Sequence, residues 1–258
     1  MRSEKACVHL RILGNEHSFE LPFVPGPTTL MEVLPTAREL TARTLEAAAR
    51  SSGQSPTCRQ GCAACCRHLV MLTGPEAFVL RAAIATMPEA ERARFEARLE
   101  AALRRAEQTG ILGRTGSRAF LAAEALEEEA LLTDVARRYF ELGIPCPFLD
   151  NEACTVYAER PLACREYTVS SDPSFCATFA HPLTRLIAKA RVTRAFGRAA
   201  QALAGTRDDG VPLLLLLEWT EAEREKLARK HDGIDVLRAF LRELGRVEER
   251  DDGADRAP

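Results

Sequence analysis

Apolar residues recur with two different periods along this chain, and the change of period separates expected strands from expected helices. Residues 8–13 alternate between apolar and polar side chains, and residues 17–24 can return as a second strand after a turn at Gly14-Asn15. Alternation on both sides of a short turn is typical of a β-hairpin. Prolines between positions 22 and 27 end it, since proline interrupts a strand ladder.

Helical spacing of apolar residues dominates the rest of the chain. It predicts helices over residues 29–50, 74–86, 88–108, 118–142, 183–204, 211–230 and 236–247. The segment 143–182 is different, because prolines interrupt it and Thr155-Val156-Tyr157 favours a short hairpin. We therefore predict a mainly α fold, a helical domain with a short N-terminal β-hairpin and cysteine-bearing loops.

The breaks between these segments suggest how the chain is organised. With 258 residues, it is long enough to bury a substantial core as one large domain. We expect a hairpin plus helix over 1–50, a cysteine-rich core over 51–182, a C-terminal helical part of the same domain over 183–246 and a flexible tail over 247–258. The tail is expected to fray because it is charged and nearly free of apolar residues.

Charge and hydropathy exclude several classes of partner. The formal charge of -2 provides no basic surplus that would draw the chain to nucleic acid or anionic lipid. The N-terminus lacks the apolar core of a signal peptide. The apolar run 211–217 is far shorter than the roughly 20 residues that span a bilayer. We expect a cytoplasmic protein without a nucleic-acid or membrane partner, and the sequence indicates no protein partner.

Eight of the nine cysteines fall into two groups, and these carry the chemistry of the chain. The groups are Cys58-x-x-x-Cys62-x-x-Cys65-Cys66 and the later set Cys146, Cys154, Cys164 and Cys176. Disulfides are typical of small secreted domains with poor cores, whereas this chain has no export signal and ample apolar residues. All eight are therefore candidate metal ligands, on loops that we expect to converge on a metal site. The ninth, Cys7, is expected to be a free thiol in or beside the first strand.

The spacing of the first group limits how it can bind a metal. In a regular helix Cys58 and Cys66 would lie about 12 Å apart along the axis, and one zinc with bonds of about 2.3 Å cannot reach both. Either a loop with a tight turn at Gly61 brings them together, or the group serves more than one metal or a multi-iron cluster. Because Cys65 and Cys66 point in different directions, one of them is a candidate ligand of a second centre, a bridging thiolate or a packed free thiol.

In the second group, prolines on both sides of Cys146 fix its backbone. A turn at Asp150-Asn151 then allows Cys146 and Cys154 to pair across a short hairpin. The dipeptide Arg160-Pro161 resembles a helix start.

Such a helix would place Cys164 in its opening turns, where free backbone amides and the helix dipole favour a thiolate. Arg160 and Arg165 flank this thiol. They are either ordinary surface arginines or positive charges that offset a negative thiolate site.

The donor set fits tetrahedral zinc and an iron–sulfur cluster equally well. His68 and His181 lie beside the cysteine groups and are weighed as further ligands, although a lone histidine is more often a hydrogen-bonded polar residue. The glycines at 110–116 lack the lysine of a phosphate loop. The cysteine spacing is also that of the cluster-binding triad of radical S-adenosylmethionine enzymes, but Ala64 stands where that triad has an aromatic residue.

The cysteine motifs resemble those of the YkgJ-type cysteine-cluster family, a zinc- or iron-chelating domain. The residues that carry the resemblance are Cys58-Arg-Gln-Gly-Cys62-Ala-Ala-Cys65-Cys66, Cys146-Pro-Phe-Leu, Cys154-x-Val-Tyr157 and Arg160-Pro161-x-x-Cys164-Arg165-Glu-Tyr167. Cys176 matches only a longer subgroup. The resemblance implies zinc or iron–sulfur binding. Flagellin lysine methylases carry a related motif, but this chain offers no residues that would transfer that activity.

Two functions remain open from the sequence. The first is a metal-binding protein that holds zinc or an iron–sulfur cluster through clustered thiolates. The second is an iron–sulfur-dependent oxidoreductase or methylase-like enzyme. No polar constellation beyond the cysteines indicates a substrate.

Overall fold

The computed structural model describes residues 4–112, 129–178, 187–188, 192–206 and 210–254. Its N-terminus is the predicted hairpin, made of β1 (Glu4–Ile12) and β2 (Asn15–Phe23) in antiparallel pairing. The turn residues Leu13 and Gly14 have φ of 49° and 82°, the positive values that two-residue hairpin turns require. The alternate apolar side chains, Val8, Leu10, Ile12, Phe19 and Leu21, are buried.

Helix α1 (Leu30–Ser52) follows and packs against β2, α2, α5 and α6. At its start the Thr29 backbone N–H donates to the Glu32 carboxylate at 2.7 Å, and the Thr29 hydroxyl lies 3.0 Å from the same oxygen. This local arrangement satisfies a backbone donor that the first helical turn leaves open. The buried face carries Leu30, Val33, Leu34, Ala37, Leu40, Ala47 and Ala48.

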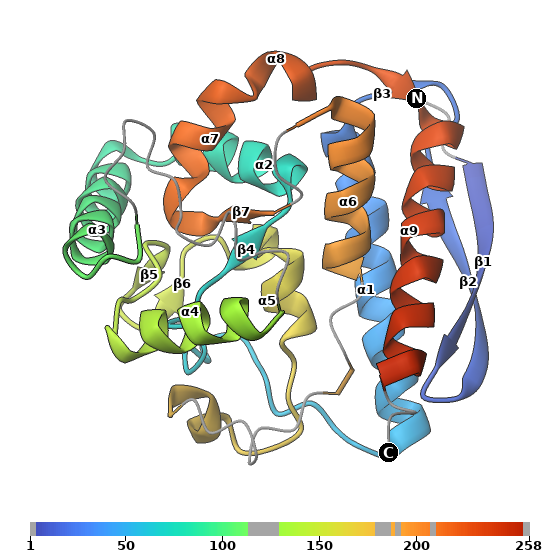
Figure 1. The fold of residues 1–258 in the computed structure, drawn as a ribbon, viewed down its shortest axis with the longest axis horizontal. Coiled ribbons are helices and arrows are strands. Elements are labelled where there is room, and N and C mark those ends of the chain that lie inside the picture. The colour runs from blue at the N-terminus through green and yellow to red at the C-terminus, as the bar shows by residue number, and fades with distance from the viewer. Residues whose placement is uncertain (1–3, 113–128, 179–186, 189–191, 207–209, 255–258) are drawn as a thin grey trace.

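Helices α6 (Val192–Ala204) and α9 (Gly233–Ala254) run beside α1, with the hairpin at the outer edge of this layer (Figure 1). Phe196 and Phe240 pack edge to face between α6 and α9, with ring centroids 5.4 Å apart. The predicted helix 183–204 is shorter in the described residues, because 187–188 form a bend. The last helix, in contrast, continues past its predicted end at Val247 into the charged terminal segment.

The other half of the molecule contains shorter helices (Figure 1). They are α2 (Gly74–Ala85), α3 (Glu89–Gln108), α4 (Glu129–Glu141), α7 (Leu216–Ala222) and α8 (Arg224–Leu227). The first two match the predicted helices closely. The predicted helix 118–142 is described from Glu129 onward, and the predicted link at 110–116 lies mostly outside the described residues.

A continuous helix over 211–230 was a wrong prediction. Val211–Pro212 form strand β7, which pairs with β4 (Met71–Leu72), and a 3-10 turn at Leu213–Leu215 precedes α7. Val211 and Pro212 instead pair with Leu72 and Met71 of a distant segment, and the helical part that follows is divided between α7 and α8. This β4–β7 pair joins the residues just after the first cysteine group to the C-terminal part of the chain.

Two further strand pairs complete the described fold. β3 (Pro27–Thr28) pairs with β8 (His231–Asp232), and β5 (Leu149–Asp150) pairs with β6 (Ala153–Cys154). The short hairpin expected around Thr155-Val156-Tyr157 is therefore the β5–β6 pair, which lies just before these three residues. Tyr157–Glu159 is a 3-10 helix. The turn is set by Asn151 and Glu152, both at positive φ.

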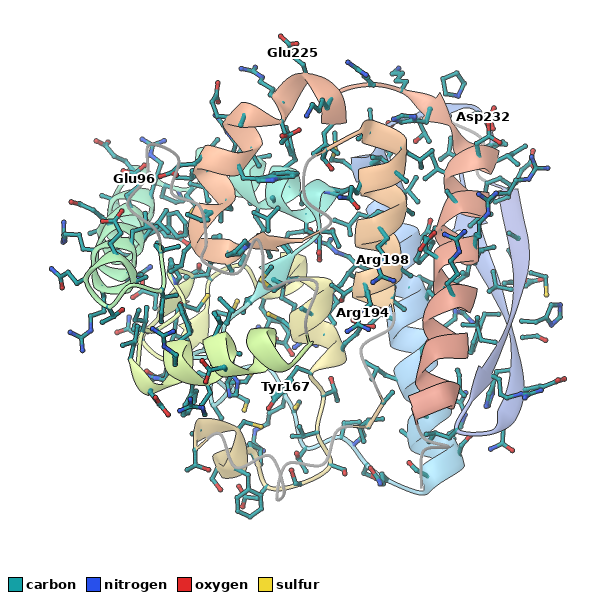
Figure 2. All side chains as sticks on the ribbon, in the orientation of Figure 1. Glu96, Tyr167, Arg194, Arg198, Glu225 and Asp232 are labelled. Carbon is teal, nitrogen blue, oxygen red and sulfur yellow. The ribbon has the colours of Figure 1, made fainter. Side chains whose placement is uncertain are left out.

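The described residues confirm the mainly α prediction with an N-terminal hairpin. Charged side chains such as Glu96 on α3 and Glu225 on α8 project outward (Figure 2). None of the helices in the described ranges combines the length and apolar character needed to span a bilayer.

Candidate metal centre

Residues 57–68, which we call the first cysteine loop, form turns rather than a regular helix. Gly61 has φ of 86°, a left-handed value that glycine adopts without steric cost. The N–H of Cys62 donates to the carbonyl of Arg59 at 3.0 Å and closes a turn around this glycine. The structure thus agrees with the loop interpretation of the spacing.

The start of the loop is held by the segment that leads to Cys176. Thr57 donates its N–H to the Val169 carbonyl at 2.9 Å and its hydroxyl to the Ser171 carbonyl at 2.6 Å. Val169 in turn donates its N–H to the Cys58 sulfur at 3.3 Å. An N–H that points at a sulfur stabilises negative charge there, as backbone donors do for thiolate ligands.

The end of the loop is held by the segment that carries Cys146 and Cys154. The N–H of Cys146 donates to the Cys66 carbonyl at 2.8 Å. Arg67 makes a two-pronged ion pair with Glu152 in the β5–β6 turn, with a shortest N–O distance of 2.7 Å.

The ring of His68 lies between Phe140 and Tyr167. Its Nε2 is 2.7 Å from the Cys176 carbonyl oxygen, so this nitrogen is engaged by backbone and the contact ties the loop to the Cys176 segment. His181 lies outside the described residues.

Helix α3 positions the hairpin that carries Cys146 and Cys154. Arg98 donates to the Pro147 carbonyl at 2.8 Å, and Phe95 packs on Phe148 with centroids 4.6 Å apart. The prediction that Cys146 and Cys154 pair across the hairpin was wrong in register, because Cys154 is opposite Leu149. Cys146 precedes the strand, and its carbonyl accepts the Leu149 N–H at 2.8 Å.

Cys164 lies in α5 (Leu162–Glu166), which begins directly after Pro161 as the sequence predicted. The prediction of a favoured thiolate there was wrong. Desolvation raises the pKa of Cys164 well above its ordinary value, and the nearby Cys146, Cys65 and Cys154 raise it further. A helix of five residues has too small a dipole to outweigh that burial.

The charge on one thiol changes the pKa of others, and Cys65 affects the largest number of them. Cys66 donates its S–H to the Cys65 sulfur, which lowers the pKa of Cys65 and raises the pKa of Cys66. Charge on Cys65 also raises the pKa of five more thiols, those of Cys58, Cys146, Cys154, Cys164 and Cys176. Desolvation is the largest cause for these five, and it brings the pKa of Cys146 to about 12 and that of Cys176 to about 11.

All nine cysteines are free thiols, and Cys7 is exposed on β1 as predicted. Among the described side chains, no three His, Cys, Asp or Glu groups are spaced to hold a metal ion. Convergence on a metal site is therefore not part of the described geometry. The chemistry of the donor set nevertheless fits a thiolate-bound metal, because all eight candidate ligands are free thiols that are partly or fully buried. In a tetrahedral zinc site the four ligand sulfurs would lie about 4 Å from one another.

Arg160 supplies positive charge beside these thiols. It lowers the pKa of Cys58, Cys65 and Cys154, although in Cys58 and Cys154 desolvation outweighs it. Its guanidinium stacks on Tyr157 at 4.4 Å from the ring centroid. Within the described part of the chain its buried Nε has no hydrogen-bond partner.

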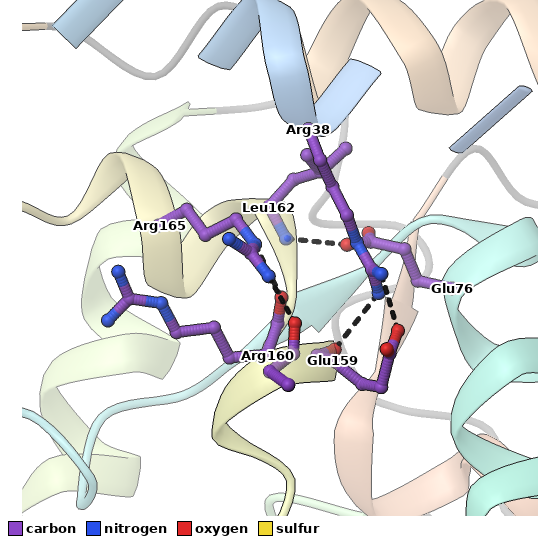
Figure 3. A network of polar contacts seen from close by, with 7 residues as sticks. Arg38, Glu76, Glu159, Arg160, Leu162 and Arg165 are labelled. Atoms are coloured by element: carbon purple, nitrogen blue, oxygen red, sulfur yellow. Dashed lines mark hydrogen bonds and ion pairs between the residues drawn. The ribbon is translucent and has the colours of Figure 1, made fainter. Parts of the chain in front are cut away.

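A partly buried polar network fixes the backbone that carries Arg160 (Figure 3). Arg38 of α1 makes an ion pair with Glu159, and Arg165 donates to the Arg160 carbonyl at 3.0 Å. Glu76 of α2 accepts hydrogen bonds from the Leu162 N–H and, at 2.9 Å, from the Thr73 N–H. These contacts hold residues 159–165 against two helices from distant parts of the sequence.

Sequence reasoning missed Glu76, Arg38 and Glu159. Thr73 and Glu76 form a Thr-x-x-Glu pattern at a predicted helix start, which is the signature of a capping box and offered a signal for Glu76. Arg38 and Glu159 are 121 residues apart, and no local pattern links them.

Residues 57–181 match a family model whose description reads "Putative zinc- or iron-chelating domain", with the motif CxxCxxCC. This segment belongs to that cysteine-cluster family. The match contains all eight candidate cysteines, and in this chain three residues rather than two separate the first pair, Cys58 and Cys62. Comparisons with curated proteins and with solved structures gave no match. The family description indicates that residues 57–181 chelate zinc or iron.

Proposed function

We propose that this protein binds a metal as zinc or an iron–sulfur cluster, and that the ligands come from the eight cysteines of the two groups. The observation that carries the proposal is that hydrogen bonds join the first cysteine loop to the segments of the second group, from the Cys146 N–H to the Cys66 carbonyl at 2.8 Å and from the Val169 N–H to the Cys58 sulfur at 3.3 Å. The family of residues 57–181 supports the same chemistry.

The surrounding residues prepare this region for negative charge. Four thiolates around a divalent ion carry a net charge of about −2, which is costly to bury without compensation. The Val169 N–H supports the Cys58 sulfur at 3.3 Å, and Arg160 provides a cation beside Cys58, Cys65 and Cys154. Bound metal would supply the positive charge that keeps these thiols deprotonated.

Anaerobic purification followed by elemental analysis and an absorption spectrum tests the proposal. We expect either zinc in a colourless protein or iron with stoichiometric sulfide in a coloured one. Only the second outcome makes electron transfer or cluster-dependent catalysis available to the protein. A chain that retains neither metal, and takes up neither zinc nor iron with sulfide after reduction, would contradict the proposal.

Replacing Cys65 by serine gives a second test at the thiol that influences most of the others. We expect the variant to lose most of its metal, while Cys7→Ser on the exposed hairpin keeps the wild-type content. Equal metal content in the two variants would argue against the cysteine groups as the binding site.

A further inference from the structure

The exposed face of the N-terminal hairpin carries a thiol, an imidazole and a hydroxyl that lie outside the proposed metal site. Cys7 and His9 are two residues apart on β1 and therefore point to the same face. Ser18 lies opposite His9 on β2. Val8 and Phe19 are buried on the other face, and a buried face fixes the register of a strand pair. The three polar side chains are thus held side by side.

Both ring nitrogens of His9 have a partner in this group. The Cys7 sulfur lies 3.7 Å from Nε2, and the Ser18 hydroxyl oxygen lies 2.8 Å from Nδ1. A serine hydroxyl can donate to a neutral imidazole or accept from a protonated one, so Ser18 keeps the ring oriented in both states. A nucleophile, a base and an orienting group in this order form the arrangement that activates a cysteine.

Reagents in solution can reach this thiol. Cys7 is exposed, whereas the other eight cysteines are partly or fully buried, and an accessible thiol with a histidine beside it is the kind that reacts. The hairpin lies at the outer edge of the layer of α1, α6 and α9 (Figure 1). Cys7 also lies outside residues 57–181, the segment that matches the chelating-domain family. Its chemistry is therefore separate from that of the two cysteine groups.

The charged groups on the same face are paired with one another. The pairs are Lys5 with Glu20 at 2.9 Å on one side of Cys7, and Arg11 with Glu16 at 3.9 Å beyond His9. Glu20 is directly opposite Cys7, and its bond to Lys5 offsets its repulsion of a negative sulfur. The proton acceptor in contact with the sulfur is His9.

We propose that Cys7 is a modification site, at which a low-molecular-weight disulfide of the glutathione type attaches by thiol–disulfide exchange. The Cys7 thiol passes its proton to Nε2 of His9, and the resulting sulfur anion attacks one sulfur of the disulfide. A bond forms between Cys7 and that sulfur as the original disulfide bond breaks. The departing thiolate takes the proton from His9 and leaves as a free thiol. Cys7 is thereby oxidised, the departing half is reduced, and His9 returns to its starting state.

The rate at which Cys7 of the full-length protein reacts with oxidised glutathione at pH 7 tests the proposal. Acid quenching and mass spectrometry of the peptide that contains Cys7 follow this thiol alone. We expect the wild type to react about tenfold faster than His9→Gln. This factor is smaller than that of a catalytic base in an enclosed site, because water screens the exposed pair. The rate of Ser18→Ala should fall between the two.

His17→Gln is the matched control. His17 belongs to the same hairpin, but its ring stacks with Phe19 and its Nε2 lies 3.4 Å from the Ser51 hydroxyl. This variant should react as fast as the wild type. The difference between wild type and His9→Gln should also disappear near about pH 10, where thiols ionise without the help of a base.

A further measurement needs no variant. Unfolding in urea frees the Cys7 sulfur from the His9 ring, so Cys7 should react more slowly at pH 7 in the unfolded wild type, although unfolding exposes every thiol. Equal rates for wild type and His9→Gln at pH 7, or faster reaction of Cys7 in the unfolded chain, would overturn the proposal. Neither result depends on the metal content of the protein.

Discussion

Arg160 illustrates how a single residue here acts on several thiols at once. Its backbone is fixed by Arg165 and by the Glu159–Arg38 ion pair, while its guanidinium stacks on Tyr157. Its charge lowers the pKa of Cys58, Cys65 and Cys154. Its positive charge is therefore held in place before any metal arrives.

We expect Arg160→Gln to weaken metal binding by about tenfold, the size typical of groups that support ligands without touching the metal. The reason is that the bound thiolates lose a cation whose charge acts on Cys58, Cys65 and Cys154. Competition with a chromophoric chelator measures the affinity. Arg59→Gln removes an equal charge from an exposed position of the first cysteine loop and should leave the affinity unchanged. A similar loss in both variants would indicate a general charge effect.

Two glutamates that cap helices are expected to respond to pH with opposite signs. Burial raises the pKa of Glu76, whereas the backbone hydrogen bond from Thr29 lowers the pKa of Glu32. The Glu76 contribution to stability is therefore complete below about pH 4.5 and is lost as pH rises through its folded pKa. The Glu32 contribution is present above about pH 4.5 and is lost as pH falls through its folded pKa.

Urea unfolding of Glu76→Gln and Glu32→Gln between pH 4 and pH 7 separates these effects. Relative to wild type, Glu76→Gln should become more stable as pH rises, by up to about 1.4 kcal/mol per pH unit inside the titration range. Glu32→Gln should become less stable over the same range. Parallel pH profiles for the two variants would contradict the opposite shifts.

At the scale of elements, glycine determines how closely α9 approaches the segment that follows the N-terminal hairpin. A Cβ on Gly233 would lie 1.6 Å from the Val24 carbonyl oxygen, so the backbone itself would have to move. Gly245, in the same helix, has nothing within 4 Å of its Cβ position. One helix thus contains a glycine that packing requires and one that it does not.

We expect Gly233→Ala to destabilise the protein by more than about 2 kcal/mol, because the overlap involves backbone. Gly245→Ala should change stability by no more than about 1 kcal/mol, toward stabilisation, since alanine favours helix. Thermal or urea unfolding of the two variants checks this. Equal effects would show that α9 can shift away from Val24 at little cost.

Most elements could be predicted because their signals are local. The hairpin followed from alternation around Gly14, and the turn in the first cysteine loop followed from Gly61. The helix predicted over 211–230 failed because Val211 and Pro212 pair with Leu72 and Met71, a long-range contact that local periodicity does not report. The eight candidate cysteines could be selected from spacing, whereas the environment of Cys164 could not, because its burial depends on contacts from other segments.

At the scale of the molecule, the candidate centre and the layer of α1, α6 and α9 occupy different parts of the fold (Figure 1). None of these three helices carries a candidate ligand. Their contact relies on buried apolar residues such as Phe196 and Phe240. Stability can therefore differ between the two parts, as it does between cooperative units in many proteins.

Removal of metal should loosen the cysteine segments more than the helical layer. In hydrogen–deuterium exchange of the metal-loaded and chelated protein, we expect protection to fall at residues 57–68 and 146–176, because metal ligation cross-links these loops. Protection of α1, α6 and α9 should change little. Uniform loss across the chain would instead make the metal a requirement for the whole fold.

The contact between Gly74 and Trp219 has an optical consequence. Trp219 is the single tryptophan of the chain, and a Cβ on Gly74 would lie 2.7 Å from the edge of its indole ring. Its fluorescence therefore originates from the α2–α7 contact and from nowhere else in the protein. Emission from a buried indole shifts to longer wavelength when water reaches it, so this one residue reports opening of α2 from α7 without any added label.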